Sequence, residues 1–513
     1  MSARESNPTA GSKMGTYFCE MPSDPCAIIM FGASGDLAKR KLMPALYDLA
    51  FHSCLAPSFR LLGFARTKMS DEDFRKSAGE FLPKGQEEGA DEAKKSEFLK
   101  CLQYFSGDYD DPEAFQKLSK RLDELDSEGG LGGNRLFYLA TPPEVYPHVI
   151  QHLKKANLTK SKGDKSWTRI IIEKPFGRDL ASAKELNKTV LDSFEESQVY
   201  RIDHYLGKET VQNMLVFRFG NGIFEPLWNR NYIDSVQITA AESLGVERRA
   251  AFYETAGALR DMIQSHVLQL TSLVAMEAPA RFDATSVRNE KIKVLQSMRG
   301  FTPESVWKEV VRGQYGPGEI DGKQVPGYRQ EPGVKPDSST DTFVALKLYV
   351  DNWRWSGVPF YLRSGKRLAQ PHTEVAILFK RAPHMVFRGE NTETNSLVLN
   401  IQPDEGISLS FGAKSPGAQM HISPVQMDFE YKTAFGSSTR PAYATLINDC
   451  IRGDATLFDR ADSVEAAWSL VDPILKAWAS ASAPPFPNYP AGSAGPRAAD
   501  DLTGSDGRQW RPL

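Results

Sequence analysis

The densest group of side chains that could do chemistry is RIDHYLGK, residues 201–208. If this segment opens a helix, His204 and Lys208 are four residues apart and share a face, with Tyr205 beside Lys208. An imidazole, a phenol and an ammonium at a helix start can bind phosphate, because each donates hydrogen bonds and the helix end is partly positive. We predict an anion site here; the alternative is a solvent-exposed helix face with an ion-paired lysine.

A second polar cluster interrupts an apolar helix predicted over residues 254–270, where Asp261, Gln264 and His266 are the polar exceptions. At about 100° per residue, Asp261 and His266 lie about 140° apart, so an α-helix does not require them to pair. His266 could act as a general base if a carboxylate from elsewhere oriented one ring nitrogen. The alternative is a hydrogen-bonded core histidine.

A glycine motif, GASGDLA at residues 32–38, follows an apolar run and precedes a helical pattern. Gly32 and Gly35 permit a tight turn and close approach to a pyrophosphate, and the helix start offers free N–H groups. The spacing is a variant of the dinucleotide fingerprint, although an ordinary tight turn is the alternative.

The next predicted strand ends at Arg66 and not at an acidic residue. A guanidinium suits a 2′-phosphate, which favours NADP, unless Arg66 is an ordinary surface residue.

Lys174 ends the apolar run IIIEK, residues 170–174. The carboxyl ends of strands are where ligands bind in open α/β sheets, and Pro175 favours an extended Lys174. Lys174 is therefore a candidate ligand-binding residue, or else a charged residue that merely terminates a strand.

The first half of the chain alternates strand-like and helical patterns, which predicts β-α-β units in a Rossmann-like, doubly wound α/β sheet. The predicted strands are residues 26–32, 59–66, 134–140 and 168–174. A lysine- and glutamate-rich segment, 70–103, is predicted to be helical.

The second half changes character after helices predicted over residues 205–218 and 254–276. Strand-like segments then follow without long helices between them, at residues 343–353, 374–380, 396–403, 407–414 and 425–431. This pattern predicts an α+β domain with a large, mostly antiparallel sheet, one face against helices and the other available to a partner. A helix over 441–478 and a proline- and glycine-rich loop end the chain.

Composition excludes several classes of protein. The 513 residues are 41% apolar and 25% charged, as in folded proteins of about two to four domains. A net charge of −3 argues against a nucleic-acid partner, and no apolar stretch is long enough to span a membrane. The N-terminus lacks the pattern of a secretory signal.

The cysteines are few and odd in number: Cys19, Cys26, Cys54, Cys101 and Cys450. They fit neither a disulfide framework nor a zinc motif, so we expect a cytoplasmic protein without a resident metal. A Cys19–Cys26 redox pair is the alternative to two inert thiols.

Six motifs in this order closely resemble the glucose-6-phosphate dehydrogenase family, and the similarity runs from about residue 26 to 480. They are GASGDLAKRKL (32–42), NRLFYLATPP (134–143), IIIEKPFGRDL (170–180), RIDHYLGKE (201–209), LRDMIQSHVLQ (259–269) and VPFYLRSGK (358–366). The resemblance implies oxidation of glucose 6-phosphate at C1 to 6-phospho-D-glucono-1,5-lactone with hydride transfer to NADP. That reaction is the first step of the oxidative pentose phosphate pathway.

The resemblance also implies a role for each matching residue. His266 is expected to be the base and Asp203 its partner. The expected substrate residues are Lys174, His204, Tyr205, Lys208, Glu242, Asp261 and Lys366. The expected cofactor residues are Gly32, Ala33, Ser34, Gly35, Asp36, Leu37, Ala38, Lys39, Arg66, Pro143, Tyr146 and Lys174.

One departure concerns phosphate binding. Relatives carry a basic residue or glutamine a few positions after the lysine of the SGK motif, where this chain has Pro371 followed by His372. Two readings stay open: weaker phosphate binding, or recruitment of His372.

The expected organisation is an N-terminal flexible tail (1–25), an NADP-binding domain (26–202) and a substrate and assembly domain (203–513). We expect a homodimer or homotetramer. The alternatives to the main function are a dehydrogenase of another hexose or hexose phosphate, and a catalytically silent NADP-binding regulator on this fold.

Overall fold

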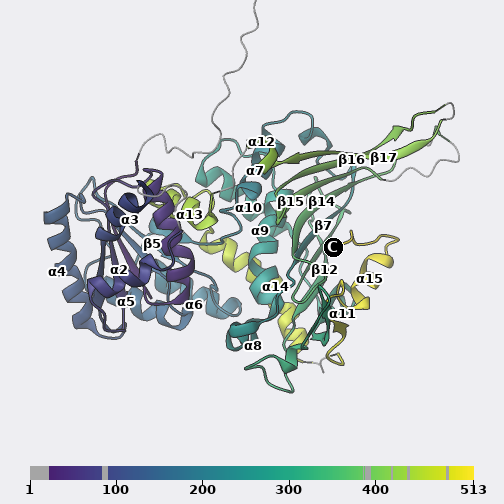
Figure 1. Ribbon diagram of the computed structural model, residues 1–513. Coiled ribbons are helices and arrows are strands. Elements are labelled where there is room, and N and C mark those ends of the chain that lie inside the picture. Colours follow the sequence, from purple (N-terminus) through teal and green to yellow (C-terminus); the bar gives the residue numbers. More distant parts are fainter. Residues whose placement is uncertain are drawn as a thin grey trace, which may run out of the picture.

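The computed structural model describes residues 22–83, 90–384, 386–387, 394–417, 420–435, 440–480 and 484–513. Two sheets organise the chain, one in each half (Figure 1). Helix α14 (Ala461–Ala479) lies between them and packs against helices of both halves, α6 and η6. The expected N-terminal tail falls almost wholly outside the described residues, as does Cys19.

The first sheet has six parallel strands in the order β3-β2-β1-β4-β5-β6. This is the strand order of dinucleotide-binding sheets, and it confirms the predicted doubly wound α/β fold. Its central strands are fully buried, which explains their unbroken apolar runs. The strands are β1 (Ala27–Phe31), β2 (Arg60–Ala65), β3 (Leu102–Ser106), β4 (Arg135–Leu139), β5 (Thr168–Ile172) and β6 (Val199–Arg201).

Helices connect these strands, and several begin at capping residues the sequence supplies. Ser70 and Asp179 each cap a helix through a reciprocal side-chain and backbone pair, and Asp111 caps the helix that begins at Pro112. The helices are η1 (Ala38–Leu42), α1 (Met43–Phe51), α2 (Asp71–Gly79), α3 (Ala90–Lys100), α4 (Pro112–Gly129), η2 (Pro143–Val145), α5 (Tyr146–Lys155), α6 (Leu180–Leu191) and η3 (Glu196–Gln198).

The second sheet has eight strands in the order β17-β16-β15-β14-β7-β13-β12-β8, and only β7 and β13 pair in parallel. The predicted large, mostly antiparallel sheet is confirmed. The strands are β7 (Ile233–Ala241), β8 (Val310–Gly313), β12 (Phe343–Tyr349), β13 (Pro359–Gly365), β14 (His372–Phe379), β15 (Ser396–Gln402), β16 (Gly406–Lys414) and β17 (Ile422–Glu430). Small strands are β9 (Tyr315–Gly316), β10 (Gly318–Ile320), β11 (Lys323–Val325) and β18 (Tyr489–Pro490).

One face of this sheet carries the π-helix η6, which contacts β7, β12 and β13. The helices of this half are α7 (Glu209–Phe219), η4 (Glu225–Leu227), η5 (Glu247–Arg249), α8 (Ala250–Ala258), η6 (Leu259–Val267), α9 (Leu268–Ala275), α10 (Ala284–Ser297), α11 (Pro303–Glu309), η7 (Tyr328–Gln330), α12 (Tyr431–Phe435), α13 (Ala442–Arg452), α14 and α15 (Arg497–Gly504). None of the described helices has the length and apolar composition that crossing a lipid bilayer requires.

The other face of the sheet is only partly open, which corrects the prediction of a free face. The C-terminal residues cross it: Arg508 pairs with Asp234 at 2.7 Å, and Arg363 lies over the Trp510 ring. The proline- and glycine-rich segment predicted as loop contains strand β18, which pairs with β9. The C-terminal segment is therefore a packed part of this half.

Several predicted elements were wrong in extent. Strands β3, β6, β7, β8 and β13 of the two large sheets were not predicted, because these strands are short or mix polar and apolar residues. The helix predicted over 441–478 is two helices, since Gly453 adopts a left-handed conformation (φ 83°) that ends α13. Asp459 then bridges to Arg201 at the edge of the first sheet. Cys26 is a free, buried thiol, and the other half of the alternative Cys19–Cys26 pair lies outside the described residues. Cys54 is disulfide-bonded, which the sequence did not lead us to expect.

Candidate active site

The predicted site residues converge where the first sheet meets π-helix η6. Lys174 comes just after the carboxyl end of β5, and Asp203 just after β6. Because parallel strands end at one edge of the sheet, these side chains reach a common space. His266 approaches that space from η6 on the other half of the chain.

His266 and Asp203 form a buried pair, which the sequence could not show. Nδ1 of His266 lies 2.5 Å from Oδ1 of Asp203, and both residues are 1% exposed. The same oxygen accepts the backbone N–H of Tyr205 at 3.0 Å, which fixes the carboxylate. With Nδ1–H donating to Asp203, the other ring nitrogen, Nε2, keeps its lone pair.

The π-helix changes the predicted relation between Asp261 and His266. A π-helix bonds residue i to i+5, so residues five apart stack on one side, whereas an α-helix separates them. Both side chains consequently meet the same ammonium, that of Lys174. No hydrogen bond joins the two side chains to each other in the described structure, in line with the expectation that they need not pair; each instead contacts Lys174.

Lys174 lies at the centre of the cluster. Its Nζ is 2.6 Å from Nε2 of His266, 2.7 Å from the carbonyl oxygen of Asp261 and 3.1 Å from Oδ1 of Asp261. The ammonium therefore donates to the lone pair that a base would use. In this structure the base is occupied by the lysine.

The charges around the pair set the protonation states. Burial by itself raises the pKa of Asp203, but the charge and hydrogen bond of His266 outweigh it and hold that pKa well below its usual range. Burial lowers the pKa of His266; Asp203 opposes this effect and Lys174 adds to it. At neutral pH the site thus holds a carboxylate and a neutral imidazole.

The segment predicted to bind an anion is not helical. Residues 203–208 form turns, and α7 begins only at Glu209, with Lys208 as its N-cap. Gly207 lies so close to the Ala442 carbonyl oxygen that a Cβ would approach it to 2.5 Å. The tight turn, and not an i, i+4 face, brings the side chains together.

Three side chains of this turn border the pair. The Tyr205 ring stacks on His266 with centroids 4.2 Å apart, and His204 meets His266 edge-on at 4.6 Å. Nζ of Lys208 lies 4.8 Å from the Tyr205 ring centre and donates to Gln402. Burial lowers the pKa of Lys208 to about 8.

Glu242 and Lys366 form the next pair, at the ends of neighbouring strands β7 and β13. Nζ of Lys366 is 2.5 Å from Oε2 of Glu242. Lys366 also contributes to lowering the pKa of Asp261, although Lys174 and Arg249 contribute more. The two pairs, Lys174–Asp261 and Lys366–Glu242, therefore lie close enough for their charges to interact.

The glycine motif occupies the turn between β1 and the first helix, as predicted. Gly32 has φ 83°, and a Cβ there would come within 2.4 Å of the Ala140 carbonyl oxygen. Gly35 donates to the Gly32 carbonyl at 2.9 Å, and helix begins at Asp36. Only glycine fits at position 32, which leaves a backbone cradle beside a helix start, suited to a pyrophosphate.

The remaining predicted cofactor residues surround this cradle. Arg66 is exposed at the end of β2, lies over the Tyr109 ring at 5.6 Å, and has no ion-pair partner among the described residues. Pro143 opens η2 after β4, and Tyr146 is buried at the start of α5. Asp36 is exposed and pairs with Arg40. An unpaired guanidinium at this strand end fits a 2′-phosphate.

His372 does not face the anion site. Its Nε2 lies 3.1 Å from Oε2 of Glu374, and that carboxylate also accepts from Arg511 of the C-terminal segment. Residues 372 and 374 share one face of β14. The reading in which His372 replaces the basic residue missing at Pro371 is therefore not supported.

Sequence reasoning missed Glu173, Gln402 and Tyr443. Glu173 is buried, accepts the Tyr138 hydroxyl at 2.5 Å, and burial raises its pKa to about 7. Tyr443 bonds the same carboxylate and lies parallel to His204. An acidic residue inside the apolar run IIIEK was a usable signal for Glu173; nothing local marked Gln402, whose partner Lys208 is far away in the chain.

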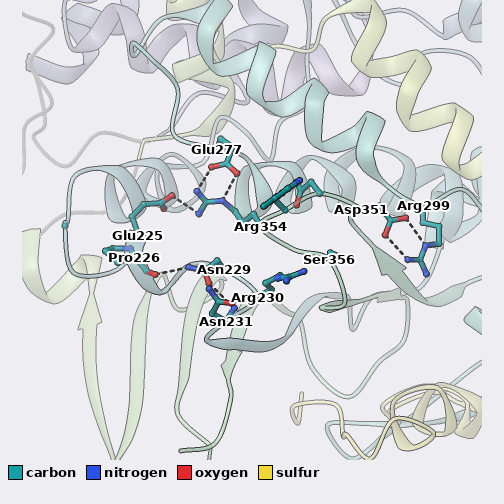
Figure 2. A pocket seen from close by; sticks show the side chains of 13 residues that line it. Glu225, Pro226, Asn229, Arg230, Asn231, Glu277, Arg299, Asp351, Arg354 and Ser356 are labelled. Atoms are coloured by element: carbon teal, nitrogen blue, oxygen red, sulfur yellow. Dashed lines mark hydrogen bonds and ion pairs between the residues drawn. The ribbon is translucent and has the colours of Figure 1, made fainter. Parts of the chain in front are cut away.

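A separate groove of about 1220 Å³ contains none of the predicted residues (Figure 2). Two of its three arginines are ion-paired: Arg354 bonds Glu277 and Glu225, and Arg299 bonds Asp351 at 2.7 Å. The groove offers structural ion pairs and no reactive group.

Comparison with known proteins identifies the family of the chain. The model of the "Glucose-6-phosphate dehydrogenase, NAD binding domain" matches residues 29–213, and that of the "Glucose-6-phosphate dehydrogenase, C-terminal domain" matches residues 215–511. This chain belongs to the glucose-6-phosphate dehydrogenase family. It is therefore an oxidoreductase of that family.

Members of the family are similar over almost their whole length. A glucose-6-phosphate 1-dehydrogenase of Chlamydia pneumoniae is 47% identical over 496 residues, which are 95% of this chain and 96% of the relative. That of Aggregatibacter actinomycetemcomitans is 48% identical over 96% of this chain and 98% of the relative. A solved glucose-6-phosphate dehydrogenase in complex with glucose-6-phosphate has a TM-score of 0.88 at 36% identity, covering 96% of this chain and 100% of that one.

Proposed function

We propose that this enzyme oxidises D-glucose 6-phosphate at C1 to 6-phospho-D-glucono-1,5-lactone and reduces NADP, the first step of the oxidative pentose phosphate pathway. The observation that carries the proposal is the buried His266–Asp203 pair, whose 2.5 Å contact leaves one ring nitrogen as a base. The test is NADPH absorbance with purified protein, glucose 6-phosphate and NADP. Absorbance should rise only when both compounds are present.

Proton abstraction follows from the tautomer of His266. Nε2 takes the proton of the C1 hydroxyl, and Asp203 stabilises the imidazolium that forms through its contact with Nδ1. Lys174 must first leave Nε2, to which it is now bonded, and the two oxygens of Asp261 retain its ammonium nearby. When bound, NADP accepts the hydride from C1.

The substrate's two ends have separate binding groups. His204, Tyr205 and Lys208 hold the 6-phosphate, since they supply hydrogen-bond donors and one positive charge beside His266. Lys174, Asp261 and the Glu242–Lys366 pair line the ring hydroxyls. Binding both ends fixes C1 at the base, which is the entropic part of catalysis.

Arg66 is proposed to select NADP over NAD. Replacing Arg66 by alanine removes charge-assisted hydrogen bonds worth about 1.5–3 kcal/mol, so the KM for NADP should rise about 10- to 100-fold. The KM for NAD should change little, because NAD lacks the 2′-phosphate. Steady-state kinetics with each cofactor measures both values. Equal effects on the two cofactors would remove Arg66 from this role, and Lys68→Ala, an exposed neighbour, is the matched control.

Lys208 should make substrate binding weaken in alkali. Its pKa is about 8 because it is buried, so the ammonium is present below that pH and is lost as pH rises through it. The KM for glucose 6-phosphate in the wild type should therefore climb above about pH 8. Lys208→Arg keeps its charge and should abolish that climb. An identical alkaline rise in both proteins would show that another group titrates.

A second candidate function is a dehydrogenase of a free hexose or another hexose phosphate. Pro371, which offers no charge near the phosphate end, is the observation that favours it. Turnover on glucose compared with glucose 6-phosphate separates the two. A higher kcat/KM on glucose would overturn the main proposal.

The proposal extends to the roles of the two domains, the oligomeric state and the cellular location of the enzyme. We assign residues 26–202 to cofactor binding and 203–513 to substrate binding and assembly. The exposed apolar side chains Val425 and Met427 on strand β17 support a homodimer or homotetramer. The free thiols of Cys26, Cys101 and Cys450 support a cytoplasmic location, whereas the disulfide at Cys54 counts against it.

A further inference from the structure

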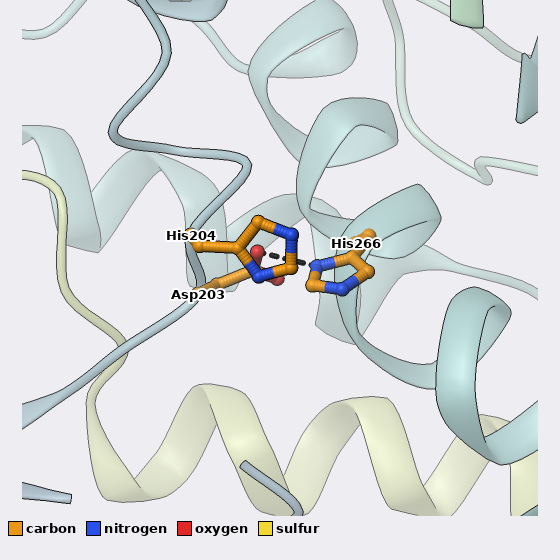
Figure 3. Close-up of side chains that lie close together, drawn as sticks. All are labelled: Asp203, His204 and His266. Atoms are coloured by element: carbon orange, nitrogen blue, oxygen red, sulfur yellow. Dashed lines mark hydrogen bonds and ion pairs between the residues drawn. The ribbon is translucent and has the colours of Figure 1, made fainter. Parts of the chain in front are cut away.

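Two imidazoles and a carboxylate converge at the centre of the site (Figure 3). Asp203, His204 and His266 each offer one ligand atom, and these atoms all lie within 4.8 Å of one another. Asp203 and His204 come from the turn after β6, whereas His266 comes from π-helix η6. The cluster therefore joins the two halves of the chain.

This donor set suits a divalent transition metal. Two histidines and one carboxylate, with a fourth position for water, are typical of Zn²⁺ sites.

Two of the ligands have unused bonding capacity. Oδ2 of Asp203 is buried without a hydrogen-bond partner in the described structure. The His204 ring makes ring contacts but no hydrogen bond to any described residue. An unsatisfied carboxylate oxygen beside an unbonded imidazole costs free energy that a bound cation would recover.

Two side chains must move before a metal ion can bind at this cluster. Zn²⁺ holds nitrogen and oxygen at about 2.0–2.2 Å, so ligand atoms in a tetrahedral site lie about 3.3–3.6 Å apart. The donor atoms here are up to 4.8 Å apart, so the side chain of the partly buried His204 must rotate toward the other two. Lys174 must also leave Nε2 of His266, 2.6 Å away, if that nitrogen is the ligand. The Asp261 carboxylate, 3.1 Å from Lys174, can retain the displaced ammonium.

We propose that Asp203, His204 and His266 form an inhibitory site for a divalent transition-metal ion such as Zn²⁺ in the substrate-free enzyme. The bound ion takes one lone pair from each imidazole, so His266 cannot accept a proton and His204 cannot donate to phosphate. Inhibition of NADP reduction by the metal rests on the proposed function, whereas binding of the metal to the three side chains does not. Metal and glucose 6-phosphate are mutually exclusive.

Direct binding is the first test, with CoCl₂ as a spectroscopic probe of the full-length enzyme in phosphate-free buffer. We expect one Co²⁺ per chain with visible absorption of a tetrahedral N/O site. His204→Gln removes one ligand and should weaken binding by at least about tenfold. His148→Gln, which alters an exposed His–Asp pair, should bind as the wild type does. Absence of wild-type binding, or equal binding by His204→Gln, overturns the proposal.

Displacement on the wild type tests the same site without any variant. Glucose 6-phosphate should abolish the Co²⁺ absorption, whereas an equal concentration of glycerol 3-phosphate, which chelates metal through the same phosphate group, should leave it largely intact. Equal loss with both compounds would mean simple chelation and would overturn mutual exclusion.

Activity is the last test. ZnCl₂ should inhibit NADP reduction, chelation by EDTA should restore it, and Mg²⁺ should not inhibit, since it disfavours imidazole ligands. Co²⁺ binding without Zn²⁺ inhibition overturns the inhibitory role. If the metal-free enzyme does not turn over glucose 6-phosphate at all, the proposed function fails while the binding result stands.

Discussion

His266→Asn should lower kcat by about 10²- to 10⁴-fold, the usual contribution of a positioned general base. Asparagine cannot accept the C1 proton, yet its amide is small enough for the space that the buried imidazole leaves. The 6-phosphate groups, His204, Tyr205 and Lys208, remain, so glucose 6-phosphate should bind with nearly unchanged affinity. Steady-state kinetics and equilibrium substrate binding measure the two effects separately.

The control for this prediction is His148→Asn. His148 is exposed and pairs with Asp110 at 2.6 Å, so its loss should leave kcat unchanged. Thermal unfolding of both variants shows whether the fold is intact. Weak substrate binding with normal turnover in His266→Asn would contradict the assignment, because it would make His266 a binding residue only.

Lys174 blocks the proposed base, His266, until substrate displaces it. In this structure it donates to Nε2 of His266 and to Asp261. A hydroxyl that replaces the ammonium at Nε2 leaves the positive charge within reach of Asp261. In the proposed mechanism, entry of the sugar would therefore free the base and keep the cation beside the reacting carbon, so that substrate binding and activation of the base are one event.

The sequence was sufficient for the parts of the fold that are set locally. Strands β1, β2, β4 and β5 are buried on both faces, so they appear as continuous apolar runs. Strand β7 was missed although it lies inside the second sheet, because IDSVQITAA mixes polar and apolar residues. Its polar side chains are satisfied by other segments; Gln237, for example, bonds the backbone of Gln509 and Arg511.

The candidate site was likewise predictable only where its residues are close together in the sequence. Composition and spacing identified the glycine turn, Lys174 and the polar cluster after β6, because each motif is contiguous. The contact of His266 with Asp203 joins two separate segments and could be expected only from the family resemblance. The π-helix was beyond prediction, since it is rare and α-helical spacing is the default. It carries both Asp261 and His266 to the ammonium of Lys174.

Asp203→Asn should lower kcat by about 10²- to 10³-fold, as expected when a preorganised electrostatic partner of the transition state is lost. Oδ1 accepts from both His266 and Tyr205, whereas Oδ2 has no partner among the described residues. An amide can therefore keep both hydrogen bonds with its oxygen, and the variant removes mainly the charge. The imidazolium that forms on proton transfer then lacks its counter-ion.

A pH profile separates this electrostatic role from a structural one. Asp203 raises the pKa of His266, and the neutral imidazole is the active form, so rates fall as pH drops through that pKa. Without the carboxylate the pKa falls further, and the acidic limb of kcat/KM must move to lower pH while the plateau drops. Asp341→Asn is the matched control: this buried carboxylate accepts the Leu259 N–H at the start of η6, so its loss should reduce stability without moving the limb. An unshifted limb in Asp203→Asn would leave Asp203 a structural role alone.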